Sequence, residues 1–168
     1  MQGKTVMADM IKMQIENAQA VQNALNAFEK KVSKKIVRQG VRAAWKPLLD
    51  RAKENARSSV GGEMGALIAR SMQLRAFRRQ KRGSYGMLVR IKAGVDEFVV
   101  VSKSGQRAYI PSAIEYGHAF PGRGGKGAPK DVAAKPFLRP ALDVTLPNAP
   151  KIFEQHLVKA IAEENAKR

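Results

Sequence analysis

The segment from Ala113 to Asp143 constrains the fold more than any other part of the chain. It contains Glu115-Tyr116-Gly117-His118, then a glycine-rich basic loop, and then Pro136-Phe137-Leu138-Arg139-Pro140-Ala141-Leu142. Gly117 permits a sharp backbone turn, and Pro140 suits the first turn of a helix, where its missing N–H is not needed. Phe137 and Leu138 can pack that helix start onto a sheet. The pattern predicts a strand end with a carboxylate, a mobile loop and an apolar anchor that opens a helix.

This combination resembles the tail-completion (neck) proteins of long-tailed phages, which join the tail to the head. That family shows a Glu–aromatic–Gly–Thr turn, a variable loop and then Pro-Phe-(Leu/Met)-Arg-Pro-Ala-(Leu/Phe). Here His118 takes the place of the usual Thr, and the segment from Pro136 to Leu142 matches at each position. Upstream, Met64-Gly65-Ala66-Leu67 stands in place of a Thr-Gly-x-Leu helix start.

The resemblance implies a structural virion protein that completes the tail and joins it to the head, as part of a neck or connector ring around the DNA channel. It implies a homo-oligomeric ring, a hexamer, with neighbouring head-connector and tail proteins as partners. It also implies a place in the virion neck or tail after assembly in the bacterial host cytoplasm. The expected subunit or partner interface consists of the motif residues Glu115, Tyr116, Gly117, His118, Pro136, Phe137, Leu138, Arg139 and Pro140.

The charge balance points to polyanionic partners. The chain has 31 Lys and Arg against 14 Asp and Glu, a net charge of +17, and such a field concentrates nucleic acid first and acidic protein surfaces second. The candidate cations for a DNA channel or for docking onto an acidic ring are Arg75, Arg78, Arg79, Lys81, Arg82, Arg123 and Lys126. The simpler interpretation of the first five is a solvated helix end. For the neck protein we expect transient, non-specific contact with DNA. An alternative function is that of a basic, sequence-independent nucleic-acid-binding protein.

The sequence offers little to an enzyme, and we expect no catalysis and no cofactor. There is no cysteine, which excludes disulfides and thiolate chemistry and fits a reducing cytoplasm. No apolar run is long enough to span a membrane. The glycine-rich loop is not a nucleotide-binding P-loop, because no Ser or Thr follows Lys126. Glu115 and His118 could share a proton or a metal, but no third ligand is near. Glu115 more simply accepts hydrogen bonds from loop N–H groups or pairs with Arg139.

The predicted fold is α+β, a single domain over 1–168 with a long N-terminal helical segment (8–56), an α/β body (63–146) and a C-terminal helix (148–166). Apolar residues at three- and four-residue steps predict an amphipathic helix over 8–39, packed either along its own domain or against a neighbouring subunit. We expect Gly40 to interrupt it, Pro47 to kink or restart the next segment (41–55), and 58–62 to form a flexible break before a further helix over 65–79.

Alternating residues predict strands over 87–92 and 98–102, the second more buried, and a third strand beginning at 107–109. Residues 112–115 then form either the strand end or a short helical turn. Together they predict one small antiparallel sheet between residues 86 and 116, with the long first and last helices on one face. After the loop from Gly117 to Lys135, a short helix should end near Thr145. Asn148 should then cap a last helix with Pro150 in its first turn.

Overall fold

The computed structural model describes residues 18–77, 85–92, 94–101, 105, 107–120 and 130–167. In chain order, the helices and single helical turns are α1 (Ala18–Asn26), α2 (Lys30–Asn55), the π-helical turn η1 (Ala56–Val60), α3 (Gly62–Ser71), η2 (Asp96–Phe98), α4 (Ile110–Tyr116), α5 (Arg139–Thr145), η4 (Leu146–Asn148) and α6 (Ala149–Asn165). The strands are β1 (Met72–Ala76), β2 (Met87–Ile91), β3 (Val99–Val101), β4 (Arg107–Tyr109), β5 (His118–Phe120) and β6 (Lys130–Val132). The fold is α+β, as predicted.

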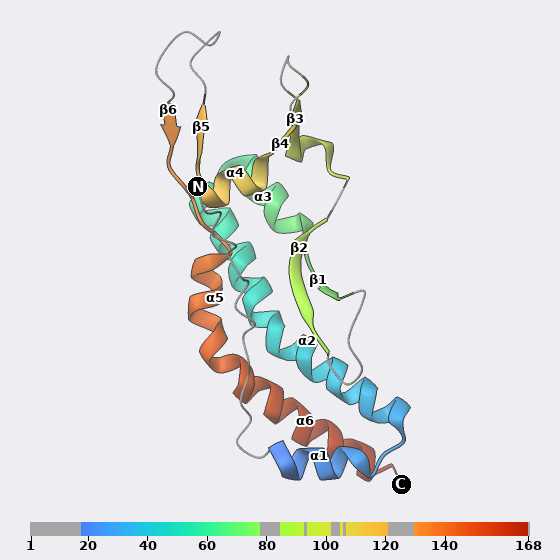
Figure 1. Ribbon diagram of the computed structural model, residues 1–168. Coiled ribbons are helices and arrows are strands. Elements are labelled where there is room, and N and C mark those ends of the chain that lie inside the picture. The colour runs from blue at the N-terminus through green and yellow to red at the C-terminus, as the bar shows by residue number, and fades with distance from the viewer. Residues whose placement is uncertain are drawn as a thin grey trace, which may run out of the picture.

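Helix α2 is the axis of the molecule (Figure 1). Helix α6 lies along α2, the β1–β2 hairpin lies beside α2 on another side, and α1 packs at the far end of the α2–α6 pair. Helices α3 and α4 and the hairpins β3–β4 and β5–β6 lie at the opposite end. Apolar residues at three- and four-residue steps fix this arrangement, because they put one side of α2 into the core; its buried residues are Ile36, Gly40, Val41, Ala44, Leu48 and Ala52.

The predicted helix over 8–39 is wrong in its boundaries. Residues 8–17 lie outside the described part. The helix is interrupted between Asn26, where α1 ends, and Lys30, where α2 begins. The Ser33 hydroxyl donates a hydrogen bond to the Leu25 carbonyl at 2.7 Å. The same carbonyl also accepts the Phe28 N–H at 3.2 Å, so the hydroxyl adds a second hydrogen bond at the end of α1 and links the two helices.

Gly40 does not interrupt α2, contrary to the prediction. A Cβ atom at Gly40 would lie 2.9 Å from Phe153 Cε2 and 3.2 Å from Leu157 Cδ2 on α6. The glycine therefore serves the close approach of two helices and not a turn. Helix α2 also continues through Pro47, so the predicted restart does not occur there. The predicted break over 58–62 is instead the turn η1 followed by Gly61, which has φ +74°.

The predicted helix over 65–79 ends at Ser71, and the next five residues form strand β1. Strand β1 pairs antiparallel with β2, with Met72 opposite Ile91 and Ala76 opposite Met87. The Lys92 N–H extends the ladder by donating to the Ser71 carbonyl at 2.8 Å. A strand partner from further along the chain thus overrides the local helical pattern.

The strands form three separate two-stranded antiparallel sheets in the described residues, and not one sheet. The strand predicted over 87–92 is confirmed, as is the pairing of β3 with β4. Strand β3 is exposed, however, and the buried residue is Phe98 just before it. Strands β5 and β6 occupy both ends of the segment predicted as a loop. The last helix packs chiefly on α2 and not on a sheet face.

The C-terminal segment follows the prediction in most respects. Helix α5 ends at Thr145, and Pro150 lies in the first turn of α6. The Asn148 side chain makes no capping hydrogen bond, because the turn η4 joins α5 to α6 and keeps the backbone helical. Helix capping requires a non-helical residue before the helix, and none is present here.

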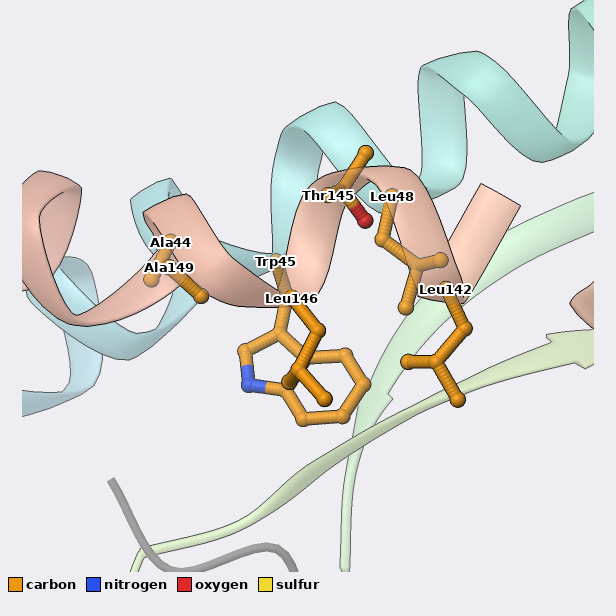
Figure 2. A pocket seen from close by; sticks show the side chains of 7 residues that line it. All are labelled: Ala44, Trp45, Leu48, Leu142, Thr145, Leu146 and Ala149. Carbon is orange, nitrogen blue, oxygen red and sulfur yellow. The ribbon is translucent and has the colours of Figure 1, made fainter. Parts of the chain in front are cut away.

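Two clusters of buried side chains share α2. The first contains Ile68, Phe98 and Phe137, the second contains Phe153 and Leu157, and Trp45 packs against both. Figure 2 shows the place where they meet, an apolar pocket between α2 and the α5–α6 segment; its walls are Ala44, Trp45, Leu48, Leu142, Thr145, Leu146 and Ala149. The core is therefore continuous along the length of α2.

We predict that Gly40→Ala destabilises the protein although alanine favours helix. The helical gain is about 1 kcal/mol, whereas overpacking against a buried ring costs about 1–3 kcal/mol. In a Phe153→Leu background the clash is reduced, so the same substitution should become neutral or stabilising. Urea denaturation of the four variants in a double-mutant cycle measures the coupling. Equal effects of Gly40→Ala in both backgrounds would contradict the close α2–α6 approach.

Candidate assembly site at the Glu115 junction

The Glu115 carboxylate is the central polar group of the junction between α4 and α5. Its side chain is buried, with 4% exposed, and it lies at the end of α4. Oε2 accepts hydrogen bonds from the N–H groups of Phe137 at 2.8 Å and Leu138 at 3.1 Å. Oε1 accepts one from the Arg139 N–H at 3.1 Å. A single side chain thus holds the segment that enters α5.

This geometry has a clear physical reason. The first N–H groups of a helix have no partner within the helix, and they carry partial positive charge. The Glu115 carboxylate accepts two such groups, the N–H of Leu138 at the start of α5 and that of Arg139, and it also accepts the Phe137 N–H just before the helix. All three are charge-assisted hydrogen bonds. The prediction that Glu115 accepts bonds from backbone N–H groups is confirmed, but the donors follow the predicted loop and lie at the entry to α5. Glu115 lies in α4, so the predicted short helical turn is confirmed and the strand end is wrong. The Arg139 guanidinium lies over the Tyr116 ring at 4.9 Å.

Gly117 and His118 complete the turn out of α4. Gly117 has φ +73° and ψ 167°, and an added Cβ would lie 2.8 Å from the Val132 carbonyl oxygen and 3.0 Å from the Ala134 nitrogen. This backbone region is essentially restricted to glycine, so the sharp turn predicted at Gly117 is confirmed. His118 Nδ1 lies 3.3 Å from the Ala113 carbonyl oxygen. Among the described residues no group of three metal-ligating side chains exists.

Phe137 anchors the far side of the junction. Its side chain is 1% exposed and belongs to the first core cluster, as predicted. The Asn55 amide donates to its carbonyl at 3.2 Å, and the Lys135 N–H donates to the Ile114 carbonyl at 2.8 Å. The segments on both sides of the β5–β6 hairpin therefore meet at one point of the core. Of the predicted interface residues, Tyr116, Arg139 and Pro140 are exposed, and His118, Pro136 and Leu138 are half-buried.

The β3–β4 hairpin exposes apolar residues beside the junction. Val99, Val100 and Val101 are 41%, 53% and 56% exposed, and Tyr109 on β4 is also exposed. The Tyr109 ring meets the buried Phe98 ring edge-on, with 6.2 Å between centroids, and burial raises the pKa of its phenol. Figure 1 shows β3–β4 and β5–β6 extending from the same end of the molecule. Both hairpins have unpaired outer strand edges within the described residues.

Of the predicted cations, the described one does not lie at a helix end. Arg75 lies exposed on strand β1, while Arg78, Arg79, Lys81, Arg82, Arg123 and Lys126 lie outside the described residues. A run of cations on α2 is absent from the predicted set, although it is visible in the sequence as Lys or Arg at repeated four-residue steps. No helix in the described part combines the length and apolarity that a membrane span requires.

Comparison with known families places these features in context. Residues 19–118 match the family described as "Bacteriophage HK97-gp10, putative tail-component". The chain belongs to this family. The match confirms the predicted relation to phage tail and neck proteins, and it covers Glu115–His118 but ends before the segment 136–142. No curated protein and no solved structure matches the chain. This member of the HK97-gp10-like family is thus a phage tail-related structural protein, and the family implies a place in the virion.

We predict that Glu115→Gln lowers the free energy of unfolding by about 1–3 kcal/mol, because the new NH₂ group opposes an N–H donor that remains buried. Glu63→Gln is the matched control, since Glu63 is exposed and has no hydrogen bond or ion pair in the described structure. The control should change stability by no more than about 0.5 kcal/mol. Urea denaturation measures both, and equal effects would contradict the role of Glu115.

We expect Phe137→Ala to cost about 3–5 kcal/mol, the range for a fully buried aromatic side chain. The loss should appear in the isolated, unassembled protein, because Phe137 is buried within its own chain. Thermal denaturation followed by circular dichroism measures it. An unchanged melting temperature in the isolated protein would mean that Phe137 contributes mainly between subunits.

Proposed function

We propose that this HK97-gp10-like protein completes the phage tail and joins it to the head, as a homo-oligomeric ring around the DNA channel. The observation that carries the proposal is the exposed β3–β4 hairpin beside the Glu115 junction. Three consecutive exposed valines on a strand with a free edge form a surface that favours pairing with another chain. Family membership supports a structural role in the tail, and this class of protein has no need of catalysis or of a cofactor.

The positions of the β3–β4 and β5–β6 hairpins, which we refer to as the arms, are compatible with a ring. A ring requires a head-to-tail contact between two different surfaces of the same subunit. The β3–β4 and β5–β6 hairpins extend from one end, so an arm can reach a neighbouring subunit while the α2–α6 body stays apart. The exposed Tyr116, Arg139 and Pro140 at the base of β5–β6 then lie next to the contact. Neighbouring head-connector and tail proteins would stack on the ring, which assembles in the host cytoplasm.

We predict that Val100→Asp abolishes head–tail joining without unfolding the subunit. A charge at the contact must lose its water on assembly, whereas in the free subunit this side chain is already exposed. Val158→Asp is the matched control, because Val158 is 56% exposed on α6, away from the arms. A phage that lacks the wild-type gene is complemented with each variant, and electron microscopy counts complete virions and free heads and tails. Thermal melts confirm folding.

Normal numbers of complete virions with Val100→Asp would contradict the hairpin contact. The same experiment with the wild-type protein tests the function itself, since purified virions must contain the protein. If the gene is dispensable for joining heads to tails, the proposed function is wrong, whatever the variants do.

A further inference from the structure

The first part of α2 carries a large excess of positive charge. Between Lys30 and Leu49 the sequence has seven cations and no acidic residue, and all seven are exposed. Four of them, Lys34, Arg38, Arg42 and Lys46, follow one another at four-residue steps, and we refer to them as the α2 cation row. Residues at this spacing lie on the same side of a helix. The row therefore forms a continuous basic ridge on the surface.

Few carboxylates approach this ridge. In the described part of the chain Lys46 pairs with Asp50 at its end, while Lys34 and Arg42 have no ion-pair partner. The Arg38 guanidinium lies 5.6 Å from the centre of the Tyr85 ring. Arg42 and Lys46 also line a groove between α2 and α6, together with Lys159 and Glu163. Glu163 is the one acidic residue of that groove, and its carboxylate lies 4.0 Å from Lys159.

In the C-terminal part of the same helix, exposed cations are paired with carboxylates, as is usual for a solvated helix face. There, Asp50 pairs with Lys46 and Glu54 pairs with Arg51. Such pairs of opposite sign stabilise a helix, whereas like charges four residues apart destabilise it. The first part instead places like charges at every four-residue step from Lys30 to Lys46. A bound polyanion would remove this repulsion, so the pattern points to an anionic ligand.

We infer that the α2 cation row binds the phosphate backbone of double-stranded DNA without reading its bases. Twelve residues of helix extend about 18 Å, and each DNA strand presents a phosphate about every 3.4 Å along the axis, so the row spans several phosphates. Contacts to phosphates carry no sequence information, which suits a passage for any genome. The inference rests on the proposed function, because a neck ring surrounds DNA. It places the DNA contact on α2 in addition to the predicted cations near Arg75.

The salt dependence of DNA binding tests this inference on the isolated full-length protein. Fluorescence anisotropy is measured with two duplexes of equal length and unrelated sequence. The variant Lys34→Gln/Arg42→Gln should reduce the slope of log affinity against log salt by about 2, equally for both duplexes. The control Lys151→Gln/Lys167→Gln removes two exposed cations from the C-terminal segment and should leave the slope unchanged.

Thermal melts give a second readout that a purely structural role would not produce. Without DNA, Lys34→Gln/Arg42→Gln should raise the melting temperature, because it removes like-charge pairs and glutamine is a good helix former. With DNA in excess, the ligand-induced rise in melting temperature should be smaller than for the wild-type protein. Opposite changes in the two conditions identify the row as a ligand site.

Three results would overturn the inference. The first is wild-type DNA binding that does not depend on salt, and the second is an equal loss of slope in the control variant. The third is that Lys34→Gln/Arg42→Gln abolishes head–tail joining but leaves DNA binding unchanged. The last result would assign the row to an acidic protein partner. These binding experiments need no ring, so their failure is distinguishable from failure of the proposed function, which the complementation of heads and tails measures.

Discussion

The buried carboxylate of Glu115 is the interaction on which the arrangement of this molecule depends. It accepts three backbone N–H groups from Phe137, Leu138 and Arg139, and so connects the end of α4 to the start of α5. The chain between them leaves the core at Gly117 and returns beside Lys135. The β5–β6 hairpin is consequently held at its base by buried hydrogen bonds, while its strands extend away from the core. One polar residue thus fixes where a surface arm begins.

Helix α2 is the second constraint on the arrangement of the molecule, because its sides contact different elements. One side packs on α6, where Gly40 lets the helices approach closely, and the hairpin β1–β2 packs on another. The remaining surface of its first part carries the α2 cation row. One long helix can make all of these contacts, because its apolar residues and its cations lie at different angles around the helix axis. The β3–β4 and β5–β6 hairpins lie at one end of this helix and the cation row lies toward the other, so the proposed contacts between subunits and the proposed contact with DNA need not compete.

The turn at Gly117 and the helix start at Pro140 could be predicted because their conformational requirements are local. Gly117 has a positive φ that other residues rarely adopt, and Pro140 is typical of the first turn of a helix. A carboxylate next to a loop is expected to accept hydrogen bonds from backbone N–H groups. The four-residue spacing of the α2 cation row is also visible in the sequence, although the predicted cations are those of the denser cluster near Arg75. The exposure of Val99–Val101 could not be predicted, since a run of valines is typical of a buried strand. These valines are accessible because no other described element covers them.

The sequence by itself determined the α+β class, the family, most helical segments, the β2 strand, and the turn and anchor on either side of the β5–β6 hairpin. Tertiary structure decided whether residues 72–76 would be helix or strand, because β2 offers hydrogen bonds that a helix end lacks. It also decided that Gly40 would continue a helix, since a missing side chain matters there only when Phe153 lies against it. Both decisions depend on partners distant in the chain, and a local pattern contains no information about what packs against it.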